Sequence, residues 1–502
     1  MDIFNNDQGL YDLPDSWEIV NLGIFFDKLQ YGYTASASKK IDKVKLLRIT
    51  DIQNRLVNWE TVPGCEISDD NFKKYQLENG DFVFARTGSI EKAWVVKDVP
   101  EAVFASYLIR GTPVLKNVSP WLQKFIETLD YVVQIRDLSA GIGRSNVNAQ
   151  NLSKVKIPLP PLNEQKRIVE KIEELFTKLD AGIELLKKLQ VKLKRYRQSV
   201  LKSAFEGKLT EKWRQANQAN LEPAEILLKR ILQERREKWE AEQVGKKTAK
   251  YQEPIQPNIS DLPDLPEGWC WVTLISLCSA IGDVDHKMPK AQDNGIPYIS
   301  TKDFIQNGDI NFEDAKKISQ EDYEKLCRKI YPEENDILLS RYGTVGEVRI
   351  IKNSKKFQAS YSIAILKPVL KKMNKFIAIC LTSEILQAQI KKYVRGVAQP
   401  DLGLVHIREL MIPFPCLVEQ EEIVSKIDDY TSLIDQLEKI IERNIKRAEK
   451  LRQSILKQAF TGKLVPQDIN DEPAAKLLEK IKQEKAKLEP KKKTTKRSKG
   501  NS

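Results

Sequence analysis

The chain has little of what catalytic and metal sites are built from. Its 502 residues include only two histidines and six cysteines. The cysteines show neither CxxC pairs nor zinc-knuckle spacing, so a zinc site or a disulfide framework is not expected. The sequence also lacks a GxxxxGK-Ser/Thr phosphate loop and the Asp/Asn-Pro-Pro-Tyr/Phe run of amino-methyltransferases. His286 and His406 are therefore expected in ordinary structural or surface roles, and the chain is expected to bind and position rather than catalyse.

Long apolar runs are missing as well. No run reaches the ~18 residues that span a bilayer, and the N-terminus does not resemble a signal peptide, so we expect a soluble, cytoplasmic chain with no membrane partner. The formal net charge is +12. Residues 491–502 hold six basic residues and no acid, which predicts a disordered basic tail. The body is only mildly basic, which weakly favours a polyanionic partner.

The chain contains a long internal repeat. The segment IPLPPLNEQ at 157–165 returns as IPFPCLVEQ at 412–420, and RQSVLKSAFEGKL at 197–209 returns as RQSILKQAFTGKL at 452–464. Both repeats have the same offset, 255 positions. Repeating arrays have units of about 20–50 residues, so this period indicates a duplicated pair of domains instead. Two copies in one chain predict pseudo-twofold symmetry and a partner that offers two sites.

The residues before each repeat predict two α+β globules with one fold. Short strand-like runs bounded by Gly, Asn and Asp recur in 14–160 and in 266–412. Elsewhere the globules differ strongly, which predicts one fold with two different surfaces. Shared landmarks are the Leu-Pro-x-x-Trp segments at 13–17 and 265–269, the Asp81/Arg86 and Asp336/Arg341 pairs, and the Ala-Ser-Tyr segments at 105–107 and 359–361.

Each globule is followed by a segment with a 3-4 apolar spacing typical of a coiled coil. The two segments are expected to pair antiparallel and to form a rod about 68 Å long at 1.5 Å per residue, close to two turns of DNA. Asn444 is expected in the seam, where it fixes the register or faces a buried water, and Gly207 and Gly462 are expected as helix C-caps. The predicted seam residues are Ile168, Ile172, Leu175, Leu179, Leu186, Ile423, Ile427, Ile434, Leu437 and Ile441.

These patterns predict six segments. Two of them, the short charged helices that follow the coiled-coil helices, each have a proline at the first turn. The predicted segments are the first globule (1–160), the first coiled-coil helix (161–215), a short charged helix and polar linker (216–264), the second globule (265–415), the second coiled-coil helix (416–465), and a short helix with the basic tail (466–502).

The duplicated IPLPPLxEQ run, the heptad helix after it, the RQSxLKxAFxGKL ending and the variable globules closely resemble the specificity subunits of type I restriction–modification systems. The resemblance covers nearly the whole chain in the family's order. It implies that each globule is a target recognition domain reading one half of a bipartite double-stranded DNA site. It also implies that the helices set the spacer between the halves and dock two methyltransferase subunits, and through them the restriction subunits.

The resemblance implies no cofactor bound by this chain and no catalysis of its own. The partner subunits are expected to use S-adenosylmethionine, ATP and Mg²⁺. Cys416 and Val418 in the second copy replace Pro161 and Asn163 of the first, a mild departure that leaves the expected fold intact.

In the first globule, polar loops are the candidates for DNA contact. Base discrimination needs directional donors and acceptors, such as Arg on guanine and Asn or Gln on adenine. An ordinary β-turn with a solvated arginine, and core positions for the tyrosines, are the alternatives. The candidates are Arg86, Thr87 and Ser89 after a predicted strand, Arg144, Ser145 and Asn146 near the helix, and Tyr31 and Tyr33.

The second globule offers counterparts in similar positions. Lys302 is expected to anchor a phosphate, because lysine contacts position a protein on DNA without specifying a base. Asp51 and Asp303 are expected to be turn residues, and Arg341→Ala is expected to weaken binding at one half-site only. The candidates are Lys302, Arg341, Tyr342, Thr344, Arg395 and Gln399.

Two other functions compete with this interpretation. In one, the coiled coil is itself the function, as an interaction scaffold without sequence-selective DNA binding. In the other, the chain has its own nuclease site. Many Asp/Glu-x-Lys triplets occur, but a chain with 30% charged residues produces them freely, so they do not identify a nuclease.

Overall fold

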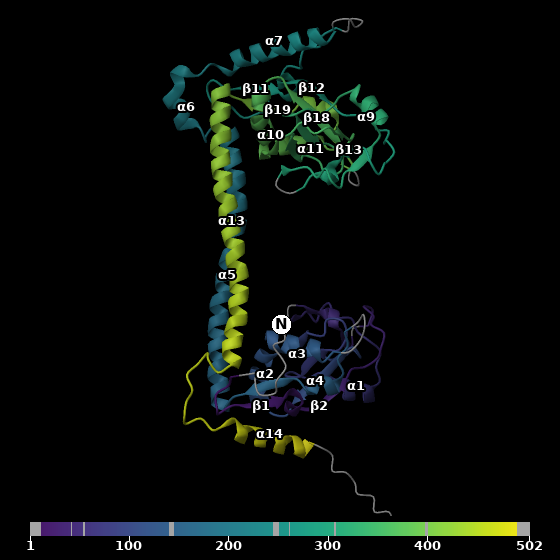
Figure 1. Cartoon of the computed structure of the whole chain (residues 1–502), viewed down its shortest axis with the longest axis vertical. Helices are drawn as coiled ribbons and strands as arrows, with labels where there is room; N and C mark the ends of the chain where they lie inside the picture. Colours follow the sequence, from purple (N-terminus) through teal and green to yellow (C-terminus); the bar gives the residue numbers. More distant parts are fainter. Residues whose placement is uncertain are drawn as a thin grey trace, which may run out of the picture. The chain divides into compact units, whose positions relative to one another are not determined.

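The structure is a computed structural model that describes residues 12–41, 43–53, 56–139, 145–243, 250–260, 262–305, 308–396 and 400–488 (Figure 1). The predicted basic tail lies outside these ranges. The chain divides into two compact units, residues 1–186 with 442–502, and residues 187–441. Each unit therefore contains one globule, the beginning of the long helix that follows it, and the end of the other long helix.

The first globule is built from small sheets of mixed direction. Its largest sheet has four antiparallel strands in the order β2 (Phe26–Tyr31), β9 (Leu108–Pro113), β6 (Phe82–Ala85) and β7 (Ala93–Val95). The smaller pairs are β3 (Lys45–Leu47) with β8 (Ala102–Phe104), β4 (Ile52–Gln53) with β5 (Leu56–Val57), and β1 (Glu18–Asn21) with β10 (Lys156–Leu159). The helices are α1 (Asp69–Tyr75), α2 (Ser119–Phe125), α3 (Leu129–Asp137) and α4 (Ala149–Ser153).

The second globule repeats this plan. The four-stranded sheet has the order β12 (Cys278–Gly282), β18 (Ile363–Pro368), β15 (Ile337–Ser340) and β16 (Val348–Ile350). A second sheet orders β14 (Lys316–Ile318), β13 (Ile296–Ile299) and β17 (Gln358–Ala359), and β11 (Cys270–Thr273) pairs with β19 (Met411–Phe414). The helices are α8 (Leu274–Leu277), α9 (Gln320–Cys327), α10 (Asn374–Thr382), α11 (Glu384–Tyr393) and α12 (Leu404–Arg408).

The two long helices, α5 (Leu162–Phe205) and α13 (Leu417–Phe460), pack together with opposite polarity. In the first unit, Ile168 and Ile172 of α5 share a core with Ile455 and Phe460 of α13. In the second unit the same arrangement recurs, with the start of α13 against the end of α5. The expected α+β fold with two antiparallel coiled-coil helices is thus confirmed.

Ion pairs at matching positions flank the helix contact. Arg452 pairs with Asp180 in the first unit, and Arg197 pairs with Asp435 in the second. Each arginine is 255 positions from its counterpart, and so is each aspartate. The pseudo-twofold relation therefore extends from the sequence repeat to individual side-chain contacts.

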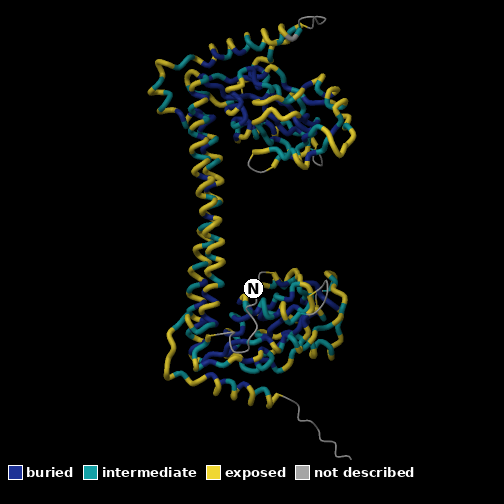
Figure 2. Tube along the Cα trace, in the orientation of Figure 1, coloured by how far each residue is buried: buried dark blue, intermediate teal, exposed yellow. Residues whose placement is uncertain are grey.

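Most of the predicted seam residues are buried or half-buried, but their frame drifts. Figure 2 shows exposed and less exposed segments alternating along the two long helices. Leu437 is 38% exposed, and Asn444 is also exposed, so both predictions of a seam position are wrong. An α-helix has 3.6 residues per turn and drifts by about 20° per heptad against a 3.5-residue repeat. One row of the 3-4 frame therefore leaves the contact line, and Glu438, next to Leu437, is the less exposed residue. The other row, with Ile434 and Ile441, stays buried.

The repeated segments meet at one joint in each unit. In the first unit the Trp17 indole donates to Glu164 at 3.0 Å, and in the second the Trp269 indole donates to Glu419 at 2.8 Å. Both glutamates lie in the first turn of a long helix and are buried. Burial raises the pKa of Glu164, which its hydrogen bonds from Trp17 and Gln467 partly offset.

Short helices then fasten each globule. Helix α7 (Ala224–Gln243) packs on α8 and β12, and α14 (Ala474–Leu488) packs on β2 and the 3₁₀ turn before it (Figure 1). The backbone amide of Ala224 donates to Gly268 at 2.9 Å, and that of Ala474 donates to Ser16 at 3.0 Å. The residues after each long helix thus complete the globule that begins the other repeat.

Gly207 and Gly462 end the long helices with φ values of +70° and +68°, as the sequence predicts. A Cβ on Gly462 would lie 2.5 Å from Cγ of Pro14. We expect Gly462→Ala to cost at least about 1–2 kcal/mol, because a side chain is strained at positive φ and collides with the joint. The thermal unfolding midpoint of the purified chain measures this loss.

Gly182→Ala is the matched control, because Gly182 lies inside α5 with open space around it. Alanine there should leave the midpoint unchanged or raise it, since glycine inside a helix costs about 1 kcal/mol relative to alanine. An equal loss in both variants would contradict the role of the joint.

Candidate nucleic-acid interface

In the first unit, the loop after β6 and the loop before α4 lie side by side and form the first loop pair, residues 86–89 with 145–147. Their backbones are joined from Gly88 N to Ser145 O at 3.2 Å and from Val147 N to Arg86 O at 2.8 Å. Gly88 has a φ of +72°, a conformation that favours glycine. The structure thus brings together two segments that the sequence predicted separately.

Arg86 is half-buried and lies over the ring of Tyr31, 4.7 Å from the ring centroid. The Tyr31 hydroxyl accepts a hydrogen bond from the backbone amide of Ala149 at 3.0 Å, so the ring is held at the start of α4. The Arg86 Nε is buried and has no hydrogen-bond partner among the residues that the structure describes. The guanidinium is therefore held by stacking, a geometry typical of arginine.

The other predicted residues of this unit divide into two groups. Thr87 and Ser89 are half-buried, while Ser145 and Asn146 are exposed. Tyr33 instead packs against Tyr75, with ring centroids 5.4 Å apart, beneath the loops, so its ring takes the core position that was the alternative for the tyrosines. Arg144 lies outside the described residues.

The second unit contains the second loop pair, residues 341–344 with 400–402. Its backbones are joined from Gly343 N to Pro400 O at 2.9 Å and from Leu402 N to Arg341 O at 2.8 Å. Gly343 has a φ of +77°. The same scaffold therefore presents different side chains in the two units.

Arg341 is 5% exposed and is held by acceptors on several sides. Its Nη1 donates to Asp283 at 3.1 Å and its Nη2 to Asp401 at 2.8 Å. Its Nε donates to the carbonyl of Leu402 at 3.0 Å. The expectation that Arg341 presents its guanidinium to DNA is therefore wrong: this side chain braces the second loop pair from inside.

The remaining candidates lie around this brace. Thr344 and Arg395 are exposed, and Arg395 exchanges two backbone hydrogen bonds with Asp401, at 3.0 and 2.9 Å. Tyr342 packs edge-on against Tyr361 at 5.7 Å. Lys302 is exposed in a 3₁₀ turn. Gln399 lies outside the described residues.

Asp51 and Asp303 are turn residues, as predicted. Asp51 accepts from the Arg48 amide at 2.9 Å, and Asp303 accepts from the Ser300 amide at 2.7 Å. Each thereby closes a capping box on a 3₁₀ turn. The sequence pairing of 105–107 with 359–361, by contrast, is wrong by one residue.

Strand register shows the correct pairing. Arg86 N donates to Tyr107 O at 3.0 Å, and Arg341 N donates to Ser362 O at 2.9 Å. Tyr107 therefore corresponds to Ser362, not to Tyr361. The offset of 255 positions that relates Arg86 to Arg341 also relates Tyr107 to Ser362, so no residue is added between these landmarks. The matching Ala-Ser-Tyr letters have an offset of 254 and were paired on their letters alone.

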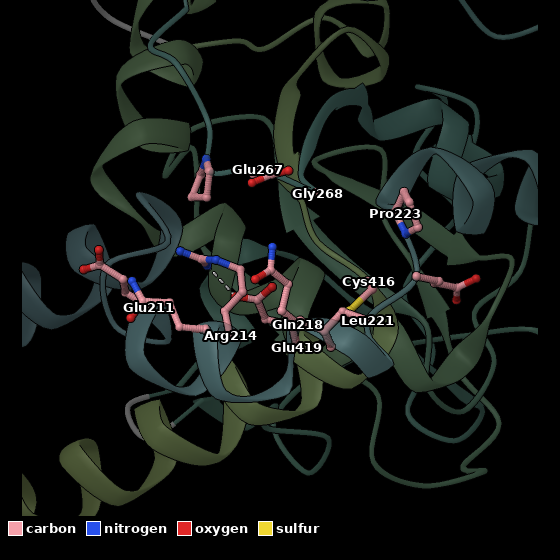
Figure 3. Close-up of a pocket in the computed structure, with 12 residues that line it drawn as sticks. Glu211, Arg214, Gln218, Leu221, Pro223, Glu267, Gly268, Cys416 and Glu419 are labelled. Atoms are coloured by element: carbon pink, nitrogen blue, oxygen red, sulfur yellow. Dashed lines mark hydrogen bonds and ion pairs between the residues drawn. The ribbon is translucent and has the colours of Figure 1, made fainter.

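A cavity of about 390 Å³ lies beside the joint of the second unit (Figure 3). Arg214 crosses it to pair with Glu419 at 2.6 Å, and Thr210 donates to the same carboxylate at 2.7 Å. Burial raises the pKa of the Cys416 thiol at its wall, so this sulfur is not an activated nucleophile. The polar groups here serve the attachment of helix and globule.

Among the residues that the structure describes, no group of His, Cys, Asp and Glu could hold a metal ion. Within those same ranges, no helix is long and apolar enough to cross a membrane. The features that stand out are two equivalent loop pairs on a duplicated scaffold.

A family model described as the type I restriction modification DNA specificity domain matches residues 14–195 and again 266–447. The chain belongs to this family. It is the DNA specificity subunit of a type I restriction–modification system, with two target recognition domains. In such an enzyme the specificity subunit is itself non-catalytic.

Curated relatives support the same family. The chain is 25% identical to the type I restriction enzyme EcoKI specificity subunit of Escherichia coli strain K12, over 97% of this chain and 99% of that protein. It is 27% identical to the EcoBI specificity subunit of Escherichia coli, over 71% and 70% of the two chains. The EcoKI subunit is thus similar along nearly the entire sequence, and the EcoBI subunit along about 71% of it.

Solved structures share the fold. One similar chain comes from a structure described as the structural basis of complex assembly and conformational transition of the type I R-M system. It aligns with a TM-score of 0.61 and 18% identity, covering 90% of this chain and all of that one. The HsdS subunit of Thermoanaerobacter tengcongensis aligns with a TM-score of 0.52 and 18% identity, covering 91% and 99%.

The residues that sequence reasoning missed are the carboxylates around Arg341. Asp283 and Asp401 lie 118 positions apart in the chain and meet only through the second target recognition domain's fold. No local motif marks either of them. Sequence alone therefore could not distinguish a braced arginine from one that is available to DNA.

Arg341→Ala should destabilise the second target recognition domain by about 3 kcal/mol, because it removes a partner of a buried carboxylate. Asp283 is 4% exposed and, among the described residues, would keep the longer contacts to Lys329 at 3.4 Å and to His286 at 3.8 Å. Denaturant unfolding of the specificity subunit measures the loss. Arg395→Ala, at an exposed position, is the matched control. Equal stability of the two variants would show that the contacts of Arg341 do not stabilise the domain.

Proposed function

We propose that each target recognition domain reads one half of a bipartite double-stranded DNA site, and that α5 and α13 set the spacing between the halves. The observation that carries this proposal is the division between shared and unshared parts. The joints with Glu164 and Glu419 repeat the tryptophan hydrogen bond and the contact of a glycine with a proline, whereas the side chains on the two loop pairs differ. Two different readers on one repeated support fit an asymmetric target with a fixed spacer.

The loop pairs are the proposed DNA-facing elements. In the first domain the contacts come from Arg86, Thr87, Ser89, Ser145 and Asn146, with Tyr31 beneath Arg86. In the second domain they come from Tyr342, Thr344 and Arg395, with Lys302 on a phosphate. Side chains of Asn, Ser and Thr supply directional donors and acceptors for base edges, whereas lysine positions without specifying.

The proposed protein partners are two methyltransferase subunits and, through them, restriction subunits. The relatives' names place those proteins in type I restriction enzymes. Helices α5 and α13 carry large apolar side chains on their outer faces, which marks a surface for protein contact. The most exposed of them are Leu185, Val418, Leu433, Val191 and Tyr196. S-adenosylmethionine, ATP and Mg²⁺ belong to those partner subunits in this proposal.

The test is methylome sequencing of cells that express the cognate methyltransferase with and without this chain. A new bipartite methylated motif that appears only with this chain supports the proposal and identifies both half-sites. A soluble, active complex without any new motif would favour the alternative of a coiled-coil scaffold.

Lengthening the helices should change the spacer alone. One heptad inserted after Leu186 and one after Ile441 adds about 10 Å at 1.5 Å per residue, which corresponds to about 3 base pairs at 3.4 Å each. The methylated motif should keep both half-sites and gain about 3 base pairs between them. A seven-residue insertion at the end of α7, outside the long helices, is the control. An altered half-site would contradict the proposal that the long helices set only the spacing.

A further inference from the structure

We propose that the two target recognition domains use an arginine at the same backbone position in opposite ways. Arg86 reads a guanine in its half-site, whereas Arg341 braces the second loop pair and reads no base. The residues at two neighbouring shared positions decide between these roles. This inference rests on the proposed function of the loop pairs and assigns a specific base contact to one of them.

The two arginines are equivalent by register. Ala85, just before Arg86, pairs with Leu108, and Ser340, just before Arg341, pairs with Ile363. Each arginine carbonyl accepts from the facing loop at 2.8 Å. Different roles for the two side chains therefore cannot come from different backbones.

The first deciding position holds Tyr31 in one domain and Asp283 in the other. Gln30 on β2 faces Arg110, and Gly282 on β12 faces Ile365, which makes the next residues, Tyr31 and Asp283, equivalent. They are 252 positions apart, as are Trp17 and Trp269. A neutral ring under Arg86 thus stands where a buried carboxylate holds Arg341.

The second deciding position holds Asn146 or Asp401. Asn146 bridges to Thr87, and Asp401 bridges to Tyr342, in the same antiparallel manner. Asp401 accepts from Nη2 of Arg341 at 2.8 Å. Asn146 brings an uncharged amide to the corresponding place, so both carboxylates that neutralise Arg341 are replaced by neutral groups around Arg86.

Arg86 is consequently a cation that no described residue of the domain neutralises. Within the described ranges its side chain makes the stacking contact with Tyr31 and no ion pair, and the neighbouring segment 140–144 contains no acidic residue. A half-buried guanidinium without an acceptor is unfavourable until a ligand supplies one. That ligand must offer acceptors and must reach the tip of the loop pair.

Guanine fits the groups that remain. With Nε buried, the two terminal nitrogens of Arg86 remain as the donors for a ligand. Two parallel donors match O6 and N7 of guanine in the major groove, which is the commonest specific arginine contact. Stacking on Tyr31, which is itself held by Ala149, restrains the guanidinium plane, and this restraint favours one base position over a mobile phosphate contact.

The experiment compares Arg86→Lys with the wild type in the complete methyltransferase complex, using selection from randomised half-sites at fixed salt. Lysine keeps the charge and loses the bidentate fork. We expect preference for guanine at one position of one half-site to fall by about tenfold or more, with the second half-site and the thermal midpoint unchanged. Uniform loss on all sequences would overturn the inference in favour of a phosphate contact, and unchanged selectivity would overturn it entirely.

The deciding positions are tested by Asn146→Asp. A carboxylate there should capture Arg86 as Asp401 captures Arg341, and should relax the same guanine preference as Arg86→Lys does. Gln150→Glu, an exposed position on α4, adds the same charge nearby and is the matched control. An equal loss of guanine preference in both variants would assign the effect to general repulsion of DNA. It would overturn the inference that the two deciding positions set the role of the arginine.

Failure of the proposed function is distinguishable from failure of this inference. If the wild-type complex selects no sequence at all, the proposed reading of half-sites is wrong. If the wild type selects a bipartite site and the Arg86 and Asn146 variants select it equally well, only the assignment of Arg86 is wrong.

Discussion

The contact between a buried glutamate and a tryptophan indole is the one on which the rest of the structure depends. Glu164 and Glu419 each stand in the first turn of a long helix, where the helix dipole favours a negative charge. Each is buried and receives the indole N–H of a tryptophan from its globule. A buried carboxylate without donors is costly, so helix and globule must meet in one geometry.

That constraint explains which segments repeat. The Pro-rich strand exit, the AFxGKL ending and the Leu-Pro-x-x-Trp entry are distant in sequence but converge on the same joint. Gly462 passes against Pro14, and Gln467 donates to Glu164 at 2.5 Å. Loop tips such as 341–344 are free of this requirement, so they can differ between the domains while the strand register beneath them stays the same.

Much of the fold was predictable, because the period of the apolar pattern and the spacing of the repeats are properties of the sequence. The antiparallel helices, the Gly207 and Gly462 caps and the turn roles of Asp51 and Asp303 follow from local chemistry. The predictions that Leu437 and Asn444 lie in the seam failed because helical drift accumulates over several turns. The prediction for Arg341 failed for another reason. Asp283 and Asp401 approach Arg341 through tertiary structure, and charge pairing between residues so far apart in sequence leaves no local signature.

Helix α14 gives the chain an order of completion during synthesis. Ala474, Leu477 and Ile481 belong to the same core as Phe26 and Trp121 of the first globule. The domain that leaves the ribosome first is thus finished last, after the second domain has all of its own residues. An interrupted transcript or a late stop codon would spare the second domain's core and leave the first one open, so half of the recognition capacity depends on a helix that is made after the second domain.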